Sequence, residues 1–250
     1  MRIFPSSGVF LALVFAATVV AQETSLTRSE VAVIKNKLVA VQQAMGADPD
    51  GYLKESEDFN LPTDFSPAQA GKFWPISSSI SLRYTDRAST EGIATAEKAA
   101  EEFQAKYAAA IASGNAEAMQ KMVEEMTRLQ AAAMTPAVKK EDMTVYVQFN
   151  MNPSVGIDPD AVVLEEPGVI ALRRKDTLGE KGEVTVYLDP VALNATQELS
   201  KIELRTSNEG VSNRTGVFHI VIQLNGALAD IESWVKTFDF TAMLGVIDPR

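Results

Sequence analysis

The sequence predicts an α+β protein, because helical signals fill its first part and strand signals its last part. From Thr24 to about Thr135, apolar residues recur at steps of three and four, the spacing of helices with one buried face. From about Asp142 onward, apolar and polar residues alternate, as in antiparallel strands with one buried face. We therefore expect N-terminal helices, including an αα-hairpin, followed by an antiparallel sheet of about five strands and a C-terminal helix.

Three helices are expected in the first part. One begins at Thr27-Arg28-Ser29-Glu30, a capping box in which hydroxyl and carboxylate satisfy free backbone amides, and ends near Gly46. A second covers about residues 89–112, and a third follows Asn115, a residue suited to cap it. Because so short a break separates the second and third helices, they should form the antiparallel hairpin.

The segment 47–88 combines turn signals with aromatic side chains. Its prolines and the run Asp48-Pro49-Asp50-Gly51 interrupt regular structure, so we expect an irregular backbone. Ile80, Leu82 and Tyr84 alternate with polar residues, which predicts one strand within it. The segment is too aromatic for a solvated linker, so it should pack over the rest of the molecule.

The second part is expected to form five strands and a closing helix. The predicted strands cover residues 143–151, 169–175, 183–189, 202–206 and 216–224. The helix begins near Leu228. We expect a helical region at 22–135 and a sheet-plus-helix region at 142–250, which either form separate domains or share one core.

Residues 1–21 have the pattern of a secretory signal peptide. A basic start is followed by the apolar run from Val9 to Ala17, and small side chains precede a cleavage position after Ala21. An uncleaved anchor is the alternative, although the apolar run is short for a spanning helix. We expect an exported protein, periplasmic or extracellular, with no transmembrane segment in the mature chain.

Charge and composition exclude several classes of function. The net charge of −10 opposes binding to phosphate backbones, so we expect no nucleic-acid partner. The chain has no cysteine, which excludes thiolate metal sites, disulfides and cysteine nucleophiles. It also has only one histidine and no phosphate-binding glycine loop, so we predict no metal and no cofactor.

No motif supplies a convincing catalytic residue. His219, the single histidine, is either a general base or a partly exposed strand residue, and we favour the second interpretation. Ser233-Trp234-Val235-Lys236 matches a Ser-x-x-Lys motif without its partner motifs, and Asp48-Pro49-Asp50-Gly51 is an incomplete calcium loop. We therefore predict a protein without catalytic residues.

Two groups of residues are candidates for binding. Met119, Met122 and Met126 form a stripe on the third predicted helix, suited either to an adaptable apolar surface or to the core of the hairpin. Aromatic residues of the segment 47–88 form the second group: Phe73, Trp74 and Tyr84. They either anchor a partner or fill the gap between the two regions.

These observations favour a binding or scaffold protein of the cell envelope, acting through its helical hairpin and aromatic surface. Its partner would be another envelope protein or a second copy of the chain. One alternative is a carrier that encloses a small apolar ligand between the methionine stripe and the inner face of the sheet. Another is a hydrolase whose carboxylates meet only in space.

Overall fold

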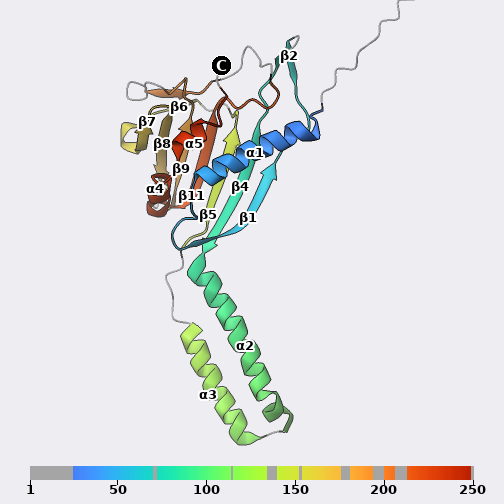
Figure 1. The fold of residues 1–250 in the computed structure, drawn as a ribbon. Coiled ribbons are helices and arrows are strands. Elements are labelled where there is room, and N and C mark those ends of the chain that lie inside the picture. The colour runs from blue at the N-terminus through green and yellow to red at the C-terminus, as the bar shows by residue number, and fades with distance from the viewer. Residues whose placement is uncertain are drawn as a thin grey trace, which may run out of the picture.

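The computed structural model describes residues 25–69, 72–113, 115–133, 140–151, 154–175, 181–193, 200–205 and 213–248 (Figure 1). The predicted signal peptide at 1–21 lies outside these residues. Helices and strands are both present, and one large antiparallel sheet organises them. The α+β class is therefore confirmed.

The large sheet has seven strands in the order β1-β4-β5-β11-β9-β8-β7, and every neighbouring pair is antiparallel. Its strands are β1 (Tyr52–Asn60), β4 (Ser78–Asp86), β5 (Met143–Phe149), β7 (Val162–Glu166), β8 (Val169–Lys175), β9 (Lys181–Leu188) and β11 (Ile220–Ala227). Two small sheets pair β2 (Pro67–Gln69) with β3 (Lys72–Phe73), and β6 (Ser154–Gly156) with β10 (Lys201–Glu203). A 3₁₀ turn at Pro159–Ala161 precedes β7.

One face of the sheet is covered by α1 (Arg28–Ala44), α4 (Leu228–Val235) and α5 (Phe240–Leu244). The predicted capping box is confirmed, because the Thr27 hydroxyl accepts from the Glu30 amide and the Glu30 carboxylate accepts from the Thr27 amide. Leu38 and Val41 of α1 are buried in one core with alternate strand residues such as Val145 and Ile222. A smaller cluster around Ile170, Ile202 and Val221 lies on the opposite face, next to β10.

Two long helices, α2 (Arg87–Ser113) and α3 (Ala116–Ala133), lie between β4 and β5 in the chain. They contact each other and extend away from the end of the sheet (Figure 1). The Tyr107 hydroxyl donates to Glu125 at 2.6 Å, and Lys106 pairs with the same carboxylate at 2.8 Å. Asn115 accepts from the amides of Glu117 and Ala118, so it caps α3 as the sequence predicts.

Three expectations about the fold are wrong. The sheet has seven strands rather than about five. The segment 47–88 is not irregular with one strand, because it contains two nine-residue strands of the large sheet. The helices do not all precede the sheet, since β1 and β4 come before α2 in the chain, and β4 pairs directly with β5 across the predicted boundary. The sequence pattern did not predict the edge strand β1, because only its ends, at Tyr52 and Phe59, carry inward-facing apolar residues.

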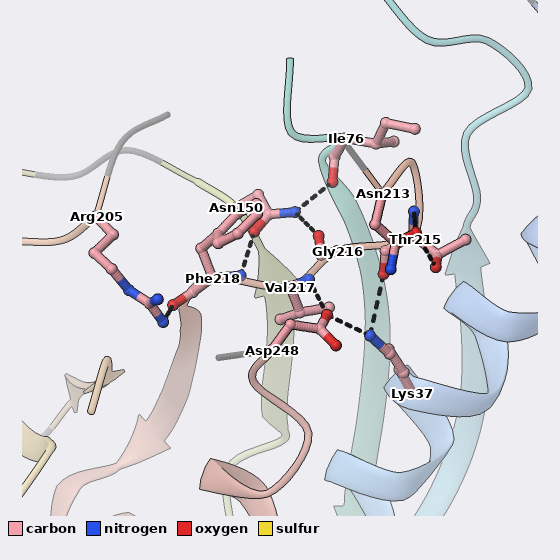
Figure 2. A network of polar contacts seen from close by, with 10 residues as sticks. All are labelled: Lys37, Ile76, Asn150, Arg205, Asn213, Thr215, Gly216, Val217, Phe218 and Asp248. Atoms are coloured by element: carbon pink, nitrogen blue, oxygen red, sulfur yellow. Dashed lines mark hydrogen bonds and ion pairs between the residues drawn. The ribbon is translucent and has the colours of Figure 1, made fainter. Parts of the chain in front are cut away.

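Asn150, at the end of β5, joins three backbone segments (Figure 2). Its side-chain amide donates to the carbonyls of Ile76 and Gly216, both at 2.9 Å, and accepts from the Phe218 amide at 2.9 Å. Its φ of 57° lies in the left-handed region, which asparagine tolerates better than most residues. Asn150 therefore sets the position at which the chain enters the central strand β11.

A second set of contacts holds the same segment from the helical side (Figure 2). Lys37 of α1 pairs with Asp248 at 2.6 Å and donates to the Thr215 carbonyl at 3.1 Å. Asp248 also accepts from the Val217 amide at 2.7 Å. The first helix, the entry to β11 and the end of the described chain are thus tied at one place.

Replacing Asn150 tests how far the fold depends on this residue. We expect Asn150→Ala to lower the free energy of unfolding by about 3 kcal/mol, because three hydrogen bonds are lost and alanine is strained at positive φ. Asn150→Gly should lose less, since glycine adopts this φ freely. Urea denaturation of both variants measures the difference, and a loss below about 1 kcal/mol for Asn150→Ala would contradict the proposed role.

Candidate functional site

The structure distributes the predicted binding residues over three separate places. Phe73 and Trp74 lie at β3, Tyr84 lies in β4, and the three methionines lie on α3. These places differ in exposure and in the contacts that the residues already make.

On α3, an apolar stripe faces outward instead of being packed. Met119, Val123 and Met126 are 43%, 54% and 44% exposed, and Met122 is half-buried. Their spacing of four and three residues places Met119, Val123 and Met126 on one side of the helix. The interpretation of this stripe as hairpin core is therefore wrong for Met119 and Met126. Val123 belongs to the same stripe and was missed, although its spacing would have identified it.

The stripe itself carries no charge, although charged residues are exposed elsewhere on α3. Successive residues turn by about 100°, so the charged residues of α3 lie away from the line through Met119, Val123 and Met126. These charged residues are Glu117, Lys121, Glu124, Glu125 and Arg128. The residues that flank the stripe are instead Ala116, Gln120 and Thr127. An exposed, uncharged apolar surface on a helix is typical of a contact surface for another molecule.

Phe73 has a structural role next to β2. Its ring meets the ring of Phe65 edge-on, with centroids 4.8 Å apart. The guanidinium of Arg214 lies 4.1 Å from the Phe65 centroid and 4.7 Å from the Phe73 centroid, and it pairs with Glu30 at the start of α1 at 3.7 Å. Trp74 is different, because it is 44% exposed and so remains available for a contact.

Tyr84 lines a cleft of about 320 Å³ between α1, β1, β4 and α4. The other lining residues are Val39, Gln42, Gln43, Met45, Gly46, Asp48, Lys54, Glu57 and Trp234. The Tyr84 and Trp234 rings meet edge-on with centroids 5.4 Å apart. Sequence reasoning found Tyr84 but could not find the cleft, because its walls come from segments that are distant in the chain.

A bulge in β1 shapes this cleft. The register with β4 shifts between Lys54, which is opposite Tyr84, and Ser56, so Glu55 is an extra residue. Residues three apart in a regular strand point to opposite faces, but the bulge places Lys54 and Glu57 on the same face. Lys54 pairs with Glu57 at 2.7 Å, and Gln42 of α1 donates to the same carboxylate at 2.8 Å. These hydrogen bonds lower the pKa of Glu57, so its carboxylate is ionised at neutral pH.

His219 is buried beside a buried ion pair, so the interpretation as a partly exposed strand residue is wrong. It is 2% exposed and its Nε2 donates to the Met151 carbonyl, while the described residues supply no hydrogen-bond partner to its Nδ1. Arg205 donates through Nε to Asp189 at 2.8 Å, and also to the Phe218 carbonyl. Asp189 further accepts from the Arg205 backbone amide at 2.8 Å. Burial lowers the pKa of His219 to about 4, so the ring is neutral at pH 7.

No group of three or more histidine, cysteine, aspartate or glutamate side chains is placed to hold a metal ion within the described ranges. Among the helices described, none has both the length and the apolar character needed to cross a bilayer.

Comparison with protein-family models, curated proteins and solved structures finds no match to this chain.

The pKa of His219 predicts how stability depends on pH. The unfolded chain binds a proton near pH 6.5 and the folded chain only near pH 4, so stability should fall as the pH is lowered through this window. The full loss attributable to His219 is about 3 kcal/mol, and none of it is expected above pH 7.

Urea denaturation of the wild type and His219→Gln between pH 7.5 and about 4 measures this effect. The difference in unfolding free energy between the two proteins isolates His219 from Asp189 and Arg205, which are present in both. A difference that is constant across this pH range would show that His219 does not titrate as stated.

Proposed function

We propose that this chain is a non-catalytic binding or scaffold protein of the cell envelope, which contacts its partner through an αα-hairpin formed by α2 and α3. The observation that supports this proposal best is the exposed, uncharged stripe of Met119, Val123 and Met126. Full burial of an exposed methionine or valine side chain contributes about 1.5–3 kcal/mol, so covering the exposed parts of these three side chains favours association.

The position of the helices supports the same proposal. Both extend beyond the end of the sheet, so a partner reaches the stripe without disturbing the core (Figure 1). The bonds from Tyr107 and Lys106 to Glu125 hold the two helices together, so the surface is largely ordered before binding. The partner is another envelope protein or a second copy of this chain, and the exposed ring of Trp74 provides a second contact.

The two alternatives have less support. An apolar carrier would need room on the inner face of the sheet, yet Val145, Val147 and Ile222 are fully buried there in the core that includes residues of α1 and α4. A hydrolase would need a carboxyl group that stays protonated as an acid. Glu57, a carboxylate in the cleft, has its pKa lowered instead.

Charge substitutions on α3 test the proposed contact. We expect native mass spectrometry of the mature protein, isolated without refolding, to show a dimer or a complex with a second protein. Met119→Glu combined with Met126→Glu should reduce that complex at least about 100-fold in affinity, because two carboxylates would be buried in an apolar contact.

The matched control is Gln104→Glu combined with Ala108→Glu, which adds the same charge at exposed positions of α2. This control should retain the complex. A monomer without any bound protein, or equal effects of both double variants, would contradict the proposed contact.

Export is also part of the proposal, and it is tested separately. We expect the protein to be recovered from the periplasm or the medium with Gln22 as its first residue. Intact-mass measurement of the isolated protein identifies this terminus. A cytoplasmic protein that retains Met1 would contradict export without bearing on the contact through α3.

A further inference from the structure

The cleft beside Tyr84 has unused binding groups. The Tyr84 residue is only 2% exposed, yet its hydroxyl has no hydrogen-bond partner among the described residues and lies at the cleft. The hydroxyl oxygen is not one of the fully buried side-chain atoms that lack a partner, so it meets solvent at the cleft although most of the residue is buried. The hydroxyl of Tyr84 is therefore available to a molecule that enters the cleft.

Most other polar groups of the cleft already have partners. Lys54 pairs with the Glu57 carboxylate, and the uncharged Gln42 amide donates to the same carboxylate. These three side chains together carry no net charge. The Trp234 indole N–H donates to the Ala47 carbonyl at 2.9 Å, and its ring packs edge-on against Tyr84 and Phe238. These bonds hold the walls of the cleft in place.

Asp48 is the charged residue that remains. It lines the cleft, and within the described ranges it forms neither an ion pair nor a hydrogen bond. Its charge reaches the Tyr84 hydroxyl, because Asp48 and Glu57 both raise the pKa of Tyr84, after the larger effect of burial. The cleft is thus electronegative at the position where the free hydroxyl lies.

We infer that this cleft binds a small organic cation that carries an ammonium group. The Asp48 carboxylate would pair with the ammonium, and the Tyr84 hydroxyl would accept a hydrogen bond from one of its N–H groups. An anion would face the unpaired charge of Asp48, and Lys54 is already neutralised by Glu57. A purely apolar molecule would leave Asp48 and Tyr84 without partners.

The cleft has the size and character of a small-molecule site. Its volume of about 320 Å³ lies at the lower end of the range for ligand pockets, so the ligand is small. It differs from the apolar ligand considered from the sequence, because the free groups are a carboxylate and a hydroxyl. The cleft shares no residue with α3, so this inference does not depend on the proposed contact through the helices.

Fluorescence of Trp234 reports binding directly. The chain has two tryptophans, so Trp74→Phe leaves Trp234 as the single indole. We would titrate this protein with 1,4-diaminobutane and, in parallel, with 1,4-butanediol, which has similar length and no charge. Saturable binding of the diamine, with the diol at least about tenfold weaker, is the expected result. Equal affinity for both, or no saturable response, would overturn the inference.

Two variants locate the site. Asp48→Asn should weaken diamine binding about tenfold or more, and Tyr84→Phe about threefold to tenfold, because each removes one hydrogen-bonding group. Asp58→Asn is the matched control, since it removes one exposed carboxylate from β1 outside the cleft. It should change the affinity less than twofold. Equal losses in Asp48→Asn and Asp58→Asn would show binding to the acidic surface in general and would overturn the site.

Thermal unfolding of each variant confirms that it is folded at the titration temperature. Asp48 is exposed and without internal bonds in the described structure, so Asp48→Asn should unfold as the wild type does. Loss of diamine binding in a folded Asp48→Asn protein therefore supports the site, and unchanged binding overturns it.

Discussion

The entry of the chain into β11 is the constraint on which the rest of the fold depends. This strand lies at the centre of the sheet and pairs with β5 on one side and β9 on the other. Asn150 holds the preceding segment against β5 and the residues before β4, while Lys37 and Asp248 attach it to α1. A one-residue slip of a strand moves every side chain to the other face, so these bonds protect the register of the core.

The fully formed sheet explains why α2 and α3 are free to make contacts. Strands β4 and β5 pair with each other directly, and α1, α4 and α5 already cover the inner face. The two inserted helices therefore have no place in the main core. Their apolar residues Met119, Val123 and Met126 are therefore left partly exposed on α3. The cleft arises differently, where the bulged edge of β1 meets the end of α1 and Trp234.

The candidate residues separate by their physical role. Phe73 packs on Phe65 and Arg214 and so stabilises the region near β2, whereas Trp74 stays exposed. Tyr84 differs from both Phe73 and Trp74, because its ring is buried and only its hydroxyl is available at the cleft. The three aromatic residues Phe73, Trp74 and Tyr84 are close in sequence and similar in chemistry, but they have three different environments.

The sequence alone determined the features that depend on neighbours along the chain. The capping box at Thr27, the cap at Asn115 and the alternation in β5 are local, and the structure confirms them. The stripe on α3 was also visible, since helical spacing is local. Only the tertiary structure decided that Met119 and Met126 are exposed, that β1 is an edge strand, and that His219 is buried beside Asp189 and Arg205. Exposure and cleft formation depend on which distant segments meet, and local patterns contain no information about those long-range contacts.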